Sequence, residues 1–151
     1  MEYRTFLCCL GYMTITEDDG YIVGIRLSPT DSSSANNVSS PLLLETEWQL
    51  CEYLGGCRRS FEFPVRLTGT PFQVAVWEAL RTIPYGQTCT YGEVATLIGR
   101  PGAARAVGSA CHRNPLLIVV PCHRVVGSGG ALTGFACGLE SKRLLLKIEQ
   151  K

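Results

Sequence analysis

The sequence is poor in the residues that bind metal ions as a set. Only two of its 151 residues are histidines, His112 and His123, and none of its eight cysteines forms a Cys-x-x-Cys pair. Structural zinc sites draw four ligands from such pairs and from histidines. The sequence therefore predicts no metal site.

Long uncharged apolar runs are also missing. Glu2 and Arg4 stand close to the N-terminus, and no run of about 18 apolar residues follows them. This pattern predicts neither a secretory signal nor a membrane span, and hence a soluble intracellular protein. With 46% hydrophobic residues the chain can bury a core, so its cysteines are expected to be reduced thiols rather than a disulfide framework.

The charges are divided unevenly between the two parts of the chain. Residues 1–67 hold five Lys and Arg against nine Asp and Glu, whereas residues 68–151 hold nine against four. The formal net charge of +1 hides this asymmetry. An anionic partner for the C-terminal part is one interpretation, and ordinary scatter of solvated charges is the other.

The N-terminal part predicts a small α+β unit, residues 1–67. The β-forming stretches "YRTFLCCLGYMTIT" and "GYIVGIRL" flank the turn signal "EDDG" and should pair as a hairpin. A polar stretch over residues 28–41 predicts a mobile loop. A helix should follow, with Leu44, Trp48 and Cys51 on one stripe, and "FEFPVRL" should return as an edge strand.

The C-terminal part, residues 68–151, predicts short helices. Thr70 and Pro71 are typical of a helix start, and "TYGE" from Thr90 is a capping box that opens a second helix ending at Gly99. The next helix, "AARAVGSACHR", follows a tight Gly/Pro turn. Two short helices joined in this way are the outline of a helix-turn-helix.

The second helix of that pair has few large side chains on its surface. One basic side chain, Arg105, stands among the small residues Ala103, Ala104, Ala106 and Gly108. Such a surface suits a helix that faces DNA, and it equally suits a helix packed tightly against a neighbour. The residues alone leave both interpretations open.

Cys122 and His123 pose a chemical question. A cysteine nucleophile reacts as the thiolate and needs a base, but neighbours in an extended segment point to opposite faces. Proton transfer between them requires a turn at Pro121 and Cys122, or a bridging water. Glu149 and Glu140 are both candidates to orient the imidazole, and spacing alone does not choose between them. A buried, inert thiol is the plainer interpretation.

These residues lie in a longer pattern. The order "TPFQVAVWEALRTIPYGQTCTYGEVA", "RAVGSACHR" and "NPLLIVVPCHRVVGSGG" resembles the O6-alkylguanine-DNA alkyltransferase family, also called methylated-DNA–protein-cysteine methyltransferases. The resemblance runs from about Thr70 to Glu149. The N-terminal part matches only in its predicted layout.

The resemblance implies roles for the reactive residues. Cys122 would accept the alkyl group, His123 would take its proton through a water, and Glu149 rather than Glu140 would orient His123. Asn114 would be the hinge that ties the helix-turn-helix to the acceptor segment, and Tyr91 would rotate the target phosphate and contact the guanine.

It also implies a DNA-binding surface and a base pocket. Arg105 would fill the space left by a flipped nucleotide, on a helix in the minor groove. The expected DNA contacts are Arg105, Ala103, Ala104, Ala106, Gly108, Arg113 and Arg124. The expected pocket residues are Val125, through its carbonyl, with Leu132, Phe135, Ala136 and Cys137. Cys137 stands where the family typically has glycine, so the pocket rim should be narrowed or reshaped.

The fold and activity implied are specific. The fold expected is α+β: a small N-terminal sheet domain, RNase H-like, then a mostly helical, winged helix-turn-helix-like C-terminal domain. The activity expected is irreversible, single-turnover transfer of an alkyl group from O6-alkylguanine in double-stranded DNA to Cys122. We expect no cofactor, no membrane partner, a monomer and a cytoplasmic location, or wherever the DNA lies.

Three other functions compete with this one. A non-repairing alkyltransferase-like binder would recognise lesions without an acceptor cysteine, yet Cys122 is present. A thiol-dependent hydrolase using Cys122, His123 and Glu149 would turn over. A plain helix-turn-helix regulator would not need the Pro-Cys-His-Arg segment.

Overall fold

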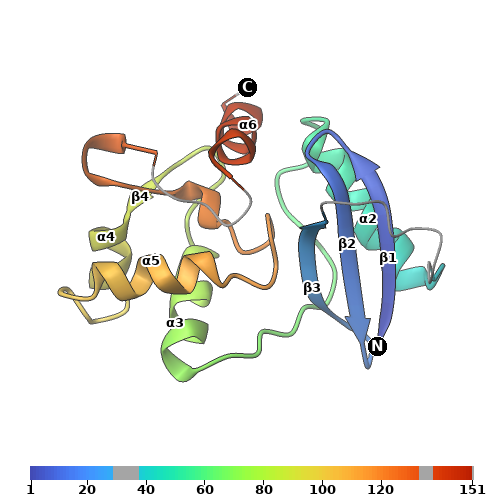
Figure 1. The fold of residues 1–151 in the computed structure, drawn as a ribbon, viewed down its shortest axis with the longest axis horizontal. Coiled ribbons are helices and arrows are strands. Elements are labelled where there is room, and N and C mark those ends of the chain that lie inside the picture. The colour runs from blue at the N-terminus through green and yellow to red at the C-terminus, as the bar shows by residue number, and fades with distance from the viewer. Residues whose placement is uncertain (29–37, 133–137, 151) are drawn as a thin grey trace. The chain divides into compact units, whose positions relative to one another are not determined.

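The computed structural model describes residues 1–28, 38–132 and 138–150. The chain divides into two compact units, Met1–Leu67 and Thr68–Lys151. Antiparallel strands dominate the first unit and helices the second, so the predicted α+β class is confirmed (Figure 1). The predicted loop over residues 28–41 falls largely on residues 29–37, which lie outside the described residues.

The first unit is built on a three-stranded antiparallel sheet of order β1-β2-β3. Its strands are β1 (Glu2–Cys8), β2 (Gly11–Asp18) and β3 (Tyr21–Ser28). The predicted hairpin is confirmed between β2 and β3, where Asp19 and Gly20 both have positive φ, the combination that two-residue hairpin turns prefer. The first β-rich stretch is two strands rather than one, because Cys9 and Leu10 form a turn.

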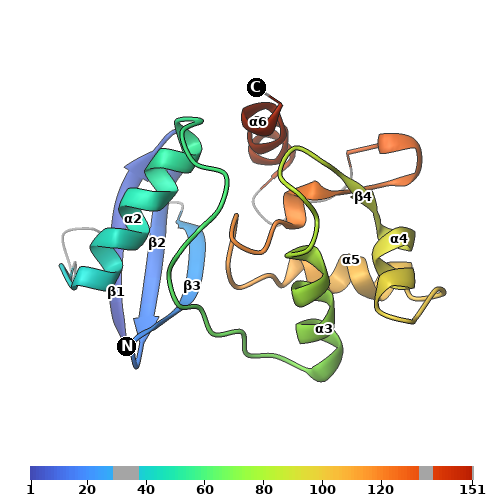
Figure 2. The same ribbon diagram turned by 180° about the vertical axis from the view of Figure 1, so that it is seen from behind.

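Helix α2 (Pro41–Leu54) covers one face of this sheet (Figure 2). The hydroxyl of Ser40 caps it by accepting from the Leu43 amide at 3.1 Å. The stripe of Leu44, Trp48 and Cys51 is exposed, and the helix buries a different set. That set is Leu43, Thr46, Gln49, Leu50 and Tyr53. Apolar spacing located the helix but not the side that packs.

The stretch "FEFPVRL" does not form the strand predicted for it. Only Val65 bridges the sheet, beside Ile22 of β3. The Ile22 amide donates to Pro64 O at 2.9 Å, and the Arg66 amide donates to Ile22 O at 3.1 Å. Pro64 has no amide hydrogen to continue such a ladder, so the pairing stays a single bridge at the edge of the sheet.

The second unit is mainly helical, with a two-stranded parallel sheet of β4 and β5. Its elements are α3 (Pro71–Leu80), β4 (Cys89–Thr90), α4 (Tyr91–Leu97), α5 (Ala104–His112), η1 (Cys122–Arg124), β5 (Val125–Val126), η2 (Ser128–Gly130) and α6 (Leu139–Glu149). Both predicted helix starts are confirmed: Thr70 with Gln73, and Thr90 with Glu93, form capping boxes. Helix α4 packs against α5 across the turn at Gly99, as a helix-turn-helix requires.

A buried hydrogen bond ties α3 to α5. The indole Nε1 of Trp77 donates to Ala110 O at 2.9 Å, and Trp77 is only 2% exposed. Gly69 lies against this ring, because a Cβ there would stand 2.7 Å from the indole. Trp77 therefore fixes the position of α5 relative to α3.

No helix among the described residues is both long enough and apolar enough to cross a membrane.

Replacing Trp77 with phenylalanine should lower the free energy of unfolding by about 1–3 kcal/mol, because Ala110 O loses its buried donor and the ring loses volume. Denaturant unfolding of the purified chain measures this change. Trp48→Phe is the matched control: Trp48 is 64% exposed, so its replacement should change the free energy by less than about 0.5 kcal/mol. Equal effects of the two substitutions would contradict the role given to Trp77.

Candidate active site

Two tight turns lead the chain into Cys122. The Val119 amide donates to Leu117 O at 2.9 Å around Ile118, which has a φ of 74°, and the Cys122 amide donates to Val120 O at 2.8 Å around Pro121. Bonds between residues two apart define γ-turns, and the form with positive φ is the rarer and strained one. Cys122 then begins the 3-10 turn η1. The turn that Cys122 and His123 require is therefore present.

Asn114 joins the end of α5 to the acceptor segment. Its Nδ2 donates to Val120 O at 2.7 Å and lies 3.2 Å from the Cys122 Sγ, while its Oδ1 accepts from the Leu116 amide at 2.9 Å. The side-chain amide of Asn114 thus bridges the segment from Leu116 to Cys122. Cys122 itself is 3% exposed, so it is almost completely shielded from solvent.

His123 is held by the last helix. Its Nε2 lies 2.6 Å from Glu149 Oε2, and both side chains are buried. An ionised carboxylate only accepts hydrogen bonds, so Nε2 carries the hydrogen and Nδ1 is the nitrogen that can take a proton. Glu140 does not reach this site: it is exposed and pairs with Arg143 at 2.8 Å.

The surroundings keep His123 neutral. Burial, the largest cause, lowers the pKa of its imidazole; the hydrogen bond and charge of Glu149 act in the opposite direction, and the charges of Arg124 and Lys142 lower the pKa further. The net direction is downward. At neutral pH the imidazole is therefore an unprotonated base on the residue that follows Cys122, and a cysteine nucleophile needs such a base to become the thiolate.

The prediction that Arg124 binds DNA is wrong. Its guanidinium donates two hydrogen bonds to Glu149, from Nε to Oε1 and from Nη2 to Oε2, both at 2.9 Å. Its Nη1 donates to Ile83 O at 2.7 Å. The side chain is 10% exposed. Arg124 balances the carboxylate that orients His123, because a buried carboxylate needs a cationic partner.

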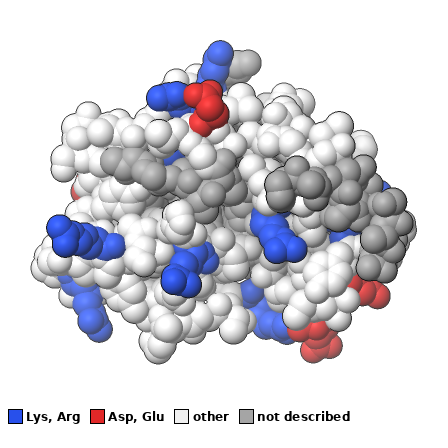
Figure 3. Space-filling view, viewed as in Figure 1, with Lys and Arg blue, Asp and Glu red and all other residues white. Residues whose placement is uncertain are grey.

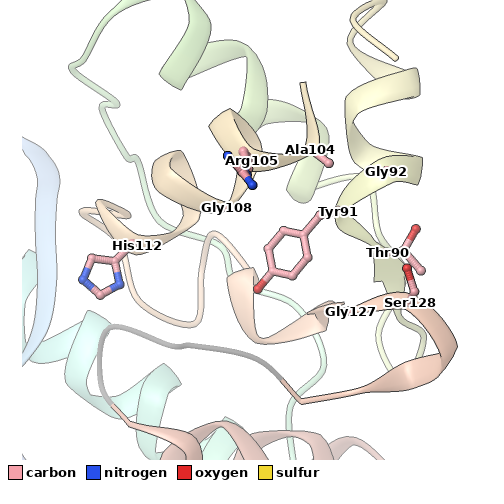
Figure 4. Close-up of a pocket in the computed structure, with 9 residues that line it drawn as sticks. All are labelled: Thr90, Tyr91, Gly92, Ala104, Arg105, Gly108, His112, Gly127 and Ser128. Atoms are coloured by element: carbon pink, nitrogen blue, oxygen red, sulfur yellow. The ribbon is translucent and has the colours of Figure 1, made fainter. Parts of the chain in front are cut away.

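A cavity of about 610 Å³ opens between α4, α5 and the loop after β5 (Figure 4). In this view the Tyr91 ring lies below Arg105 of α5, and His112 of the same helix lies to its left. The lining residues are Thr90, Tyr91, Gly92, Ala104, Arg105, Gly108, His112, Gly127 and Ser128. The small residues of α5 leave room here: even a Cβ on Gly108 would meet the Tyr91 ring only at ordinary contact distance, 3.7 Å.

The outer face of α5 is accessible. Arg105, Ala106 and Arg113 are exposed, whereas Val107, Ala110 and Cys111 face inward. Ala103 precedes the helix and is partly exposed. On the face shown in Figure 3, Lys and Arg side chains predominate over the part of the molecule that holds α4 and α5.

The pocket residues expected from Val125 onward are only partly described. The Val125 carbonyl accepts from Lys142 Nζ at 2.6 Å. Leu132 lines a second cavity, of about 600 Å³, with Thr88 and Arg143 rather than the one around Tyr91. Phe135, Ala136 and Cys137 lie outside the described residues.

Sequence reasoning missed several residues of the site. His112 and Gly127 line the cavity, and the glycine-rich stretch after Cys122 was the available signal for Gly127. Lys142 is fully buried although lysine is typically a surface residue, so nothing in the sequence singled it out. In the described part of the chain, no three His, Cys, Asp or Glu side chains are grouped to hold a metal ion.

Comparison with known proteins agrees with this geometry. Residues 71–151 match the family described as "6-O-methylguanine DNA methyltransferase, DNA binding domain". The chain is 42% identical to a methylated-DNA–protein-cysteine methyltransferase of Mycolicibacterium paratuberculosis, over 100% of this chain and 93% of the relative. The chain belongs to this family. The constitutive methylated-DNA–protein-cysteine methyltransferase of Bacillus subtilis is also 42% identical, over 98% of this chain and 94% of its own.

The solved structures of this family include one with a closely similar fold. The crystal structure of Mycobacterium tuberculosis OGT in complex with DNA is 41% identical and superposes with a TM-score of 0.90, covering 99% of this chain and 93% of that one. A methyltransferase of the archaeon Pyrococcus kodakaraensis has a TM-score of 0.57 at 27% identity, over 98% of each chain. These two solved structures therefore match both units of the chain.

The neutral state of His123 predicts how stability depends on pH. Its pKa is lowered in the folded chain, so below about pH 6.5 the unfolded state binds a proton that the folded state does not. The free energy of unfolding should therefore fall as the pH falls, by about 1 kcal/mol from about pH 7.5 to about pH 5.5. Urea unfolding at the two pH values measures it.

The two histidines of the chain provide the control. His123→Gln should remove this fall within the variant's own pair of measurements, whereas His112→Gln, which changes an exposed imidazole, should keep it. If the fall followed His112 instead, the neutral form of His123 would be the wrong assignment.

Proposed function

We propose that this protein repairs DNA directly, by transferring the alkyl group of O6-alkylguanine to its own Cys122. The observation that carries the proposal is a cysteine followed by a buried, neutral imidazole that a carboxylate holds, in the same unit as a cavity lined by Arg105 and Tyr91. Membership of the methyltransferase family supports the same reaction.

The transfer begins at the thiol. The proton of Cys122 moves through a water to Nδ1 of His123, and Glu149 stabilises the imidazolium that results. The thiolate attacks the alkyl carbon in line with the carbon–oxygen bond, and that bond's electron pair stays with guanine, which takes up a proton. Asn114 supports the sulfur through its Nδ2, 3.2 Å away. A thioether forms on Cys122.

The alkylated base must leave the helix to reach this sulfur. Extruding a nucleotide costs roughly a few kcal/mol of stacking and pairing, and less for a damaged base. Arg105, exposed on α5, enters the stack in its place while the bare Ala and Gly surface lies in the minor groove. Tyr91 lines the cavity that receives the nucleotide. Sequence readout in the minor groove is poor, which suits a protein that must act at any sequence.

The protein acts once. No group in the described part of the site offers a route to cleave the thioether, and neither water nor a thiol cleaves such bonds readily. One monomer is therefore consumed for each lesion, without a cofactor. We place the reaction in the cytoplasm, at the nucleoid, or in a nucleus, wherever the cell keeps its DNA.

Mixing the protein with a duplex that contains O6-methylguanine should add a single methyl group, located on Cys122 by intact mass and peptide mapping. Cys122→Ala should lose transfer and keep DNA binding. Repeated turnover would favour a hydrolase, and lesion binding without transfer would favour a non-repairing binder. Methyl groups on other cysteines with Cys122 unmodified would contradict the assignment of the acceptor.

Arg105→Ala should slow transfer from duplex DNA by about tenfold or more, because the vacated stack is no longer filled, while transfer from the free methylated base stays near the wild-type rate. Single-turnover kinetics with both substrates measure the difference. Arg81→Ala, which removes the same charge at the end of α3, is the control and should change neither rate. Equal losses on duplex and free base would argue against a role in the stack.

A further inference from the structure

Lys142 is a fully buried lysine next to the acceptor site. It lies in the first half of α6, and its exposed fraction is 0%. Transferring an ammonium group from water to a protein interior is costly unless hydrogen bonds and charges compensate it. A methionine or leucine would fill the same space without that cost, so the charge itself calls for a function.

Two elements of the site hold the ammonium in place. Nζ donates to the carbonyl of Val125, which directly follows η1, at 2.6 Å. It also lies 5.9 Å from the centre of the Tyr91 ring at the start of α4, within the range of a cation–π interaction. Lys142 therefore links α6 to the acceptor turn and to the cavity at once.

Burial lowers the pKa of Lys142, and the charges of two thiols when ionised, Cys122 and Cys111, act against that lowering and favour the ammonium form. Burial raises the pKa of Cys111 to about 12, so Cys111 stays protonated at neutral pH and does not compete as a nucleophile. The other titratable groups of this part of the site are His123, which is neutral, and Arg124 and Glu149, which form an ion pair of their own. Cys122 is thus the group on which the charge of Lys142 can act.

We propose that Lys142 is an electrostatic positioning residue, whose ammonium, fixed by Val125 and Tyr91, stabilises the thiolate of Cys122. The inference rests on the proposed alkyl transfer and deepens it. When the thiol proton passes to His123, the negative charge left on sulfur lies near a fixed cation rather than near an apolar wall. The alkyl carbon then bonds to sulfur, the carbon–oxygen bond breaks, and the proton held by His123 returns to guanine through solvent.

The ionisation of the Cys122 thiol can be measured without DNA. Iodoacetamide reacts with the thiolate, so the rate at which Cys122 is modified, followed by peptide mass spectrometry across pH, gives the midpoint of its ionisation. In Lys142→Gln, which keeps a hydrogen-bond donor but loses the charge, the midpoint should rise by about 1 pH unit and the rate near neutral pH should fall by about tenfold. Lys142→Arg, which keeps the charge, should shift the midpoint by less than half as much.

Lys147 provides the matched control on the same helix. It is exposed, so Lys147→Gln should leave the midpoint unchanged. An unchanged midpoint in Lys142→Gln would overturn the proposal, and so would an equal rise in Lys147→Gln. This assay needs no methyl transfer: if wild-type protein failed to take a methyl group from DNA, the proposed function would fail while the role of Lys142 would still be measured.

A second measurement leaves the lysine in place, in case Lys142→Gln does not fold. Carbon-13 NMR of labelled lysine follows the titration of Lys142 in wild-type protein and in Cys122→Ser. Because coupling between two charges is reciprocal, removing the thiolate should lower the pH at which Lys142 titrates. Identical titrations in the two proteins would show that the two groups do not interact and would overturn the proposal.

Discussion

The carboxylate of Glu149 is the point on which the active site depends. It receives His123 at 2.6 Å and two nitrogens of Arg124 at 2.9 Å, and the Gly86 amide donates to it at 3.2 Å. The loop after α3, the acceptor turn and the last helix therefore meet at one buried group. A carboxylate in that position is stable only with a cation beside it, and Arg124 supplies one while leaving His123 neutral. Charge balance and base strength are thus set by the same contact.

A second set of contacts places the sulfur rather than the base. Asn114 bonds to both the backbone and Cys122, and Trp77 fixes α5, the helix that ends just before Asn114. The exposed face of α5, which carries Arg105, and the buried thiol of Cys122 are consequently connected through Asn114 within the second unit. A movement of α5 on contact with DNA would displace Asn114, and Asn114 would pass that displacement on to Cys122. The same helix lines the cavity around Tyr91, through Arg105 and Gly108 among others.

Local signals in the sequence predicted local structure well. The capping boxes at Thr70 and Thr90 and the Asp-Gly turn were recognisable because each depends on a few neighbouring residues. Features that depend on distant contacts were not. The buried side of α2 was not evident from apolar spacing, since Trp48 and Leu44 face outward. The family resemblance placed Arg124 among the DNA contacts, and no local signal pointed to its partner Glu149, 25 residues further along the chain.

The same distinction holds within the site. Cys122, His123 and Glu149 were predicted as a group only through the family pattern, since residue spacing left Glu140 equally possible. The rare turn at Ile118 has no sequence signal, because a β-branched residue disfavours positive φ and is held there by its surroundings. Lys142 was missed because burial of a lysine is decided by what packs around it.

The separation in sequence between the thiol and its base-orienting carboxylate bears on how the protein folds. His123 and Glu149 lie 26 residues apart, and the helix that carries Glu149 is the last element of the second unit. Contacts of this kind form after local helices and turns, because closing a long loop costs entropy before any contact offsets it. A chain whose last helix has not docked carries an acceptor thiol without an oriented base. An acceptor that works once is thereby kept from reacting before the fold that selects its substrate is complete.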